Sequence, residues 1–371
     1  MRRIVLLSNL ATASAAILFA AEAPVRVPLE PGLTIVTALS DREGDYESIK
    51  TVEAVTADAV KLAYSADVPG AGGAKPRRVN TRRIVRRDDL RAAHEYMQLF
   101  NPAGPEVYAG TTAIGASSAV LTELKTKGRT SFTFQTPGRQ ASADKILAAL
   151  TGGGAKDAKR LDDIGKELDA SKASGTIERV EPSAVPFPVL VNGRRTTVPA
   201  IHARGTFDEI RADFYFLDDP DNAIALKWNT GTATGALQVV QISWPLPAAP
   251  AIEQALKDAG RAEIHGIYFD FGSATIKPES EPVLKEIADA IGKNPSWRLS
   301  VEGHTDNVGS DPANLELSRR RATAVKDALT ARFHVSADRL TAAGFGASRP
   351  KEPNGTPEGR ARNRRVELIR R

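Results

Sequence analysis

The chain contains no cysteine among its 371 residues. That absence excludes a disulfide-stabilised scaffold, a thiol nucleophile, a cysteine-ligated metal centre and a lipid-modified N-terminal cysteine. Histidine is scarce, with five residues, and aromatic residues make up only 6% of the chain. Neither sign of charge dominates, because 50 lysine and arginine residues stand against 45 acidic ones. The mild positive excess favours an anionic or zwitterionic polymer as partner and does not by itself indicate nucleic acid.

Long hydrophobic runs are also missing: residues 4–19 are apolar or small and carry no charge, but this stretch is shorter than the ~20 residues that span a bilayer. Arg2 and Arg3 precede this stretch, and small residues follow it at 20, 21 and 23. A basic start, a short apolar segment and small residues are typical of a secretory signal peptide. We therefore expect residues 1–23 to direct export and the mature protein to have no helical membrane span. An uncleaved signal anchor is the alternative.

The length predicts two domains or more, at ~100–200 residues each. Prolines among alanines in residues 245–254 predict a stiff, extended linker. It separates residues 24–244, which we expect to be a soluble, β-rich domain, from a second domain in residues 255–371. The basic run of residues 75–87 lacks aromatic neighbours, which favours a solvated face over a nucleic-acid site.

Alternating apolar residues and turn signals predict the strands of the N-terminal region. Asn192-Gly193, between two apolar runs, is a strong hairpin signal. Further strands are expected at 33–39, 59–66, 130–135, 212–217 and 223–228, with helices at 89–100 and 113–125. The region has no recognisable catalytic motif. An outer-membrane β-barrel is a weaker interpretation, because these strands are short and lack the aromatic girdles of such barrels.

The last 120 residues or so alternate strand and helix patterns. Strands are predicted at 264–271, 297–302, 339–343 and 366–369, and amphipathic helices at 279–291 and 314–332. This βαβαββ order predicts a small sandwich with its helices on one face of a mixed sheet, within an α+β protein.

Arg321 stands out on the second of these helices. At about 100° per residue it falls roughly 40° from Leu317, within the apolar stripe. A guanidinium in that position needs a carboxylate or carbonyl partner, because an unpaired buried charge is costly. Asp306 lies in the glycine-containing turn 303–309, close to the start of this helix. The two side chains can form a structural salt bridge, or they can hold the carboxylate and ammonium of a zwitterionic ligand.

Five segments of this region, FDFGSATI, VEGHTDNVGS, ANLELSRRRATAV, LTAAGFGASRP and EGRARNRRVEL, occur in an order and spacing that resemble the OmpA-like C-terminal domain. The resemblance covers residues 257–371. It implies non-covalent binding of peptidoglycan, with Asp306 and Arg321 gripping the diaminopimelate of the stem peptide. Asn314 and Arg364 match further residues that line the family's site, and Phe271 and Gly272 match its wall.

The resemblance also implies a role. We expect a periplasmic protein, associated with the outer membrane, that tethers the N-terminal region or the membrane to the wall. Peptidoglycan is the expected partner, with outer-membrane or other envelope proteins as further candidates, and no cofactor, metal or nucleic acid is expected. The alternative is an outer-membrane β-barrel porin or adhesin with a periplasmic wall-binding domain.

Catalysis is not expected. His304 and Asp306 are two residues apart, but a metal site needs a third ligand. Ser118, Ser131 and Ser243 lack the G-x-S-x-G context of a hydrolase nucleophile. A flagellar-stator role requires a membrane helix with an ionisable residue, and the only hydrophobic segment, residues 4–19, has none.

Overall fold

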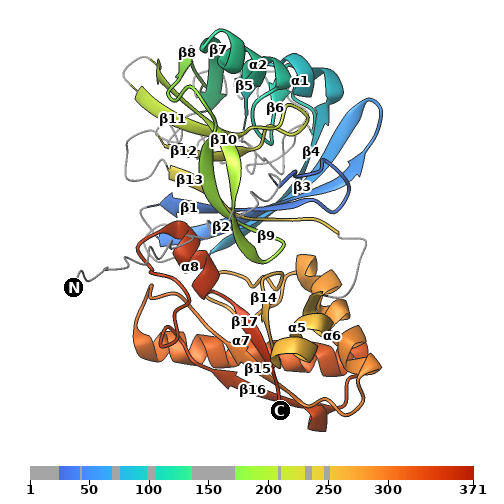
Figure 1. Ribbon diagram of the computed structural model, residues 1–371. Helices are drawn as coiled ribbons and strands as arrows, with labels where there is room; N and C mark the ends of the chain where they lie inside the picture. The colour runs from blue at the N-terminus through green and yellow to red at the C-terminus, as the bar shows by residue number, and fades with distance from the viewer. Residues whose placement is uncertain are drawn as a thin grey trace, which may run out of the picture.

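The computed structural model describes residues 25–41, 44–68, 76–97, 106–135, 172–207, 210–229, 236–245 and 251–371. The predicted signal peptide and residues 246–250 of the predicted linker lie outside these ranges. The described residues form two units, one above the other in Figure 1, which we call the N-terminal part (residues 25–245) and the C-terminal part (residues 251–371). No helix among the described residues is long and apolar enough to cross a membrane.

The N-terminal part is built on one highly connected β-sheet. Its path runs β4-β3-β2-β1-β13-β12-β11-β10-β8-β7-β5-β6, and β9 pairs with both β10 and β13, so that β9 to β13 close a ring of hydrogen-bonded strands. The strands are β1 (Thr34–Asp41), β2 (Gly44–Val55), β3 (Ala59–Val68), β4 (Arg77–Arg86), β5 (Glu95–Tyr96), β6 (Thr111–Thr112), β7 (Arg129–Gln135), β8 (Lys172–Arg179), β9 (Val185–Val191), β10 (Arg194–Phe207), β11 (Ile210–Leu217), β12 (Ala225–Asn229) and β13 (Ala236–Ser243). Two short helices, α1 (Arg87–Ala92) and α2 (Ser118–Thr126), complete the described elements of this part.

Aromatic side chains fill one of its cores. Phe134 and Phe214 lie 5.0 Å apart, edge to face, and Phe134 packs in the same way on Trp228 at 5.4 Å. Phe132 contacts Phe214 at 5.2 Å. Rings at these distances gain a modest attraction beyond their burial, so the few aromatics of this chain are concentrated where they pack on one another.

The predicted hairpin is confirmed: Asn192 and Gly193 have φ of 46° and 76°, the left-handed pair that such a turn requires. Both predicted helices were too long. The one placed at 89–100 ends at Ala92, because Ala93 turns extended and the chain enters β5. The one placed at 113–125 begins at Ser118, where the Ser117 hydroxyl accepts a bond from the Val120 N–H and caps it.

The basic run was also interpreted incorrectly at one position. It forms β4, in which alternate side chains face opposite sides of the sheet. Arg83 is therefore buried rather than solvated, with its guanidinium 4.4 Å from the Tyr108 ring and 3.0 Å from the Thr111 hydroxyl.

The C-terminal part is a four-stranded mixed sheet of order β14-β17-β15-β16, in which only the β15–β16 pair is parallel. Helix α7 packs on β15 and β16, and α6 packs on α7 (Figure 1). Together with the β-rich N-terminal part this confirms the predicted α+β class. The elements are α5 (Ala251–Ala259), β14 (Arg261–Ile264), the 3₁₀ turn η3 (Pro278–Ser280), α6 (Glu281–Lys293), β15 (Leu299–Gly303), α7 (Asp311–Phe333), η4 (Ala337–Arg339), β16 (Leu340–Gly344), α8 (Pro357–Asn363) and β17 (Val366–Arg370).

Two boundaries differ from the prediction. Helix α5 begins at residue 251, inside the predicted linker, because Ile252 and Leu256 lie one turn apart and both pack into the core. The strand placed at 264–271 is instead β14, which ends at Ile264. Beyond Ile264, the Tyr268 N–H donates to the Ser280 hydroxyl and the Tyr268 carbonyl accepts from the Lys277 N–H, so this backbone does not pair with a neighbouring strand.

Two glycines set how closely α7 approaches the sheet. A Cβ on Gly303 would lie 2.2 Å from the Ser318 carbonyl oxygen, and one on Gly344 would lie 2.3 Å from the Arg319 backbone nitrogen. Only glycine allows this approach. The close packing fixes the height of Arg321 above the strand ends.

Candidate functional site

All six predicted site residues line a single pocket of about 280 Å³, at the junction of the two parts. Gly272 and Phe271 form one wall, and Asp306 and Asn314 come from the turn after β15 and the first turns of α7. Arg321 lies further along α7. Arg364 follows α8, the helix that lies between the two parts in Figure 1.

Asp306 is held by the turn in which it sits. The Val308 N–H donates to its Oδ1 at 3.0 Å, which closes the turn around the carboxylate. Its Oδ2 lies 2.5 Å from Nη1 of Arg364. The salt bridge of Asp306 is thus with Arg364, so the alternative of a structural Asp306–Arg321 bridge was wrong in its partner.

Arg321 has the carbonyl partner that its place on the helix requires. Its Nε donates to the Ser273 carbonyl at 2.9 Å, and its guanidinium lies 4.9 Å from the centre of the Phe269 ring. Burial, and then the charge of Arg364, lowers the pKa of Arg321 to about 10. The guanidinium is still charged at neutral pH, and only its Nε is used by the bond to Ser273, so its terminal nitrogens are the ones placed to bind an anion.

Arg364 joins two carboxylates. Its Nη1 bonds Asp306, and its Nη2 bonds Glu47 of β2. Burial opposes the charge on Arg364, but Glu47 and Asp306 more than offset it and raise the pKa of the guanidinium. Around Asp306 the pocket therefore brings together the guanidinium groups of Arg321 and Arg364 and the carboxylates of Asp306 and Glu47. Groups of both signs suit a ligand that carries one charge of each sign.

The remaining predicted residues shape the pocket. The Asn314 side chain donates to the Val308 carbonyl at 3.1 Å and so braces the turn that carries Asp306. Gly272 has φ of 63°, which allows the chain to turn there. Phe271 is 40% exposed, an unusual state for a phenylalanine, and its ring forms part of the open wall.

His304 also lines the pocket. Its ring stacks on Phe345 with 5.4 Å between centroids, and it is buried. Burial and the nearby cation of Arg365 lower the pKa of His304 to about 4, so the ring is neutral at physiological pH. The described residues contain no cluster of three or more His, Asp or Glu that could hold a metal ion.

The N-terminal part also reaches this pocket, which no sequence pattern indicated. Glu47 and Tyr46 of β2, Asp67 of β3 and Gln241 of β13 all line it. None of them belongs to a recognisable motif. A strand pattern does not reveal which residues of the strand contact another domain.

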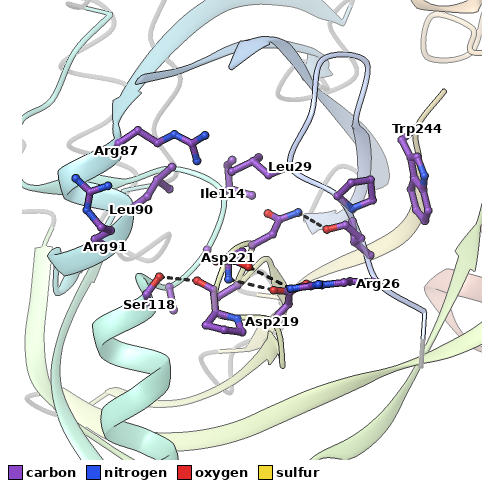
Figure 2. A pocket seen from close by; sticks show the side chains of 17 residues that line it. Arg26, Leu29, Arg87, Leu90, Arg91, Ile114, Ser118, Asp219, Asp221 and Trp244 are labelled. Carbon is purple, nitrogen blue, oxygen red and sulfur yellow. Dashed lines mark hydrogen bonds and ion pairs between the residues drawn. The ribbon is translucent and has the colours of Figure 1, made fainter. Parts of the chain in front are cut away.

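A second pocket, of about 640 Å³, lies within the N-terminal part. Figure 2 shows Arg26 beside Asp219 and Asp221, to which its guanidinium lies 3.6 and 3.2 Å distant. The other two arginines shown, Arg87 and Arg91, bond the Thr56 carbonyl and Asp88. None of the six predicted site residues lines this pocket, so we place the candidate site in the pocket of Asp306 and Arg321.

Residues 268–364 match the OmpA family. This stretch is an OmpA-family domain. It contains all six of the predicted site residues, and the family resemblance inferred from the sequence motifs is thereby confirmed.

The relatives of the OmpA-family domain match this chain over parts of their length. Outer membrane porin F of Pseudomonas aeruginosa is 48% identical over 101 residues, which are 27% of this chain and 29% of the porin. Peptidoglycan-binding protein ArfA of Mycobacterium tuberculosis is 31% identical over 214 residues, 57% of this chain and 62% of ArfA. The chain thus spans less than two thirds of these relatives.

Two similar solved structures match a third of this chain or less. The cell wall anchor of the T6SS from Pseudomonas aeruginosa is 31% identical and covers 33% of this chain and 100% of its own, with a TM-score of 0.27. The peptidoglycan-associated lipoprotein from Burkholderia pseudomallei is 28% identical and covers 28% of this chain and 88% of its own, also with a TM-score of 0.27.

Proposed function

We propose that the OmpA-family domain binds peptidoglycan non-covalently, through the diaminopimelate residue of the stem peptide. The observation that carries the proposal is the single pocket in which Asp306 faces the guanidinium groups of Arg321 and Arg364. The similarity to ArfA, a peptidoglycan-binding protein, supports the polymer as partner.

The chemistry of the ligand fits this pocket. The far carbon of diaminopimelate carries an ammonium and a carboxylate. Asp306 accepts hydrogen bonds from the ammonium, and Arg321 donates to the carboxylate, each bond being strengthened by charge. Arg364 adds positive potential beside Asp306. These groups bind and orient, and we propose that the domain cleaves no bond.

In the cell, the domain would attach the N-terminal part to the wall. The signal peptide expected at residues 1–23 places the protein in the envelope, where the wall is accessible. The basic residues at the end of the chain, among them Arg370 and Arg371, would add weak, salt-sensitive attraction to an anionic wall.

Co-sedimentation of the full chain with purified diaminopimelate-type sacculi tests the proposal. We expect Asp306→Ala and Arg321→Ala to lose binding by about tenfold or more, since a hydrogen bond to a charged group contributes ~1.5–3 kcal/mol. Arg320→Ala is the matched control, because Arg320 is the adjacent, exposed arginine on α7. Equal binding by all four proteins would contradict the proposal, and release of soluble muropeptides would show catalysis instead.

A further inference from the structure

The N-terminal part supplies a carboxylate to the binding pocket. Glu47 extends from β2 and bonds Nη2 of Arg364, across the junction of the two parts. Glu47 and Arg321 also line the same pocket, and the charge of Glu47 offsets part of the lowering that burial imposes on the pKa of Arg321. A ligand carboxylate needs these same cations. Glu47 thus lines the pocket that the ligand would enter and already pairs with one of its guanidinium groups.

Ion pairs and hydrogen bonds around the pocket hold the neighbouring strands β2, β3 and β4 against the C-terminal part. Lys277 and Asp67 form an ion pair of 2.6 Å whose side chains are 4% and 8% exposed, and Asp67 also accepts a bond from the Phe271 N–H. Arg78 lies 2.5 Å from Asp270. These bonds join β3 and β4 to the wall segment that carries Phe271 and Gly272.

Further contacts close the opposite side. The side chain of Gln241 donates to the His265 carbonyl at 2.6 Å and to the Tyr268 hydroxyl at 3.1 Å. An apolar cluster of Val36, Ala38, Ile49 and Val240 packs against Tyr268 and Ala361. The junction therefore combines apolar burial with buried polar bonds, so β2 is docked in the pocket and does not merely approach it.

We propose that β2 is an internal competitor for the wall-binding pocket, with Glu47 occupying the position of the ligand carboxylate. The inference rests on the function proposed above and adds its regulation. Wall binding then requires the N-terminal part to leave the pocket, and the observed affinity is the intrinsic affinity reduced by the fraction of open molecules. Whatever draws the N-terminal part away, such as a partner of that part, promotes attachment to the wall.

The first test is sacculus binding by the full-length Glu47→Gln variant. Removal of the negative charge weakens the bond from Nη2 of Arg364 and makes that nitrogen available to a ligand carboxylate, so binding should be about tenfold tighter than in the wild type. Glu53→Gln is the matched control, because Glu53 lies on the same strand and pairs with Arg82 instead, at 3.0 Å. Unchanged or weaker binding by Glu47→Gln would overturn the proposal, and weaker binding would make Glu47 part of the ligand site.

The second test locks the two parts together. A Cβ built on Gly193 lies 3.8 Å from the Cβ of His265, the mean separation in disulfides. The chain has no native cysteine to interfere, so the pair Gly193→Cys and His265→Cys forms one defined crosslink. The left-handed backbone at Gly193 makes its cysteine strained, and the single variant Gly193→Cys controls for that strain.

The oxidised double variant should fail to bind sacculi, and reduction should restore the binding of the Gly193→Cys single variant. Equal binding in the oxidised and reduced states would overturn the internal competitor and leave the proposed function standing. Absence of binding in both states, and in Glu47→Gln, would overturn the proposed function and the competitor with it.

Discussion

The buried ion pair between Asp67 and Lys277 allows a sharp prediction. Its two charges come from different parts of the protein, and Nζ of Lys277 lies 2.6 Å from Oδ2 of Asp67. Both side chains are at most 8% exposed, and the Phe271 N–H donates to the same carboxylate. We consider Asp67→Ala, which removes one charge and one hydrogen-bond acceptor at once.

The magnitude follows from what is left behind. Removing one partner of a buried ion pair costs about 3–5 kcal/mol, because the other charge stays buried without a counter-ion. Here the molecule has a way to limit that cost, since separation of the two parts returns Lys277 to water. The lost free energy therefore appears as weaker docking between the two parts, whereas the hydrophobic core within each part stays packed.

Hydrogen–deuterium exchange measures this directly. A loss of about 3 kcal/mol corresponds to roughly 100-fold faster exchange of amides whose protection depends on docking. We expect that acceleration in the segment 265–277 and not in the strands β15 and β17. Asp88→Ala, which removes an 83% exposed carboxylate, is the control. Exchange of the segment 265–277 within a factor of two of the wild type would refute the reasoning.

Three further predictions concern stability. Gly344→Ala should lower the free energy of urea unfolding of the C-terminal part by ~1–3 kcal/mol and weaken sacculus binding, because its Cβ would meet the backbone of α7 at 2.3 Å. Gly292→Ala in α6 should instead raise that free energy by ~0.5–1 kcal/mol, because a Cβ there meets nothing within 4 Å. Equal effects of the two substitutions would contradict this prediction. The folded-state pKa of His304, about 4, lies below its ordinary 6.5, so the unfolded chain takes up the proton first. Stability should be full above pH ~6.5 and fall by at most about 3 kcal/mol toward pH 4, and an unchanged pH profile of unfolding in His304→Gln would contradict that assignment. Phe214→Ala should cost ~3–5 kcal/mol in thermal or urea unfolding, because the ring is fully buried among other aromatics; a loss below ~1 kcal/mol would argue against the packing described.

Sequence patterns predicted the fold where local rules decide the structure. The Asn192-Gly193 turn forms as expected because few residues adopt its left-handed backbone. The two helices that cover the C-terminal sheet were found from the spacing of their apolar residues. Boundaries were missed where tertiary contacts compete. The β-rich pattern of residues 264–271 did not reveal that Tyr268 bonds Ser280 instead of a strand.

Only those site residues that belong to the C-terminal part could be predicted from the sequence. The motifs of the C-terminal part identified six residues that the structure brings to one pocket. The apolar stripe of α7 also indicated that Arg321 needs a buried partner, and the Ser273 carbonyl provides it. Glu47 could not be found in this way, because its role depends on how two separately folded parts dock.

The measurement that tests the central claim most directly compares two wall chemistries. Sacculi with diaminopimelate in the stem peptide carry both an ammonium and a carboxylate at the far carbon, whereas sacculi with lysine carry the ammonium alone. The account predicts that the full chain binds the diaminopimelate wall about tenfold or more tightly, because only that wall offers a partner for Arg321. Equal binding to both walls, or a preference for the lysine wall, would contradict it.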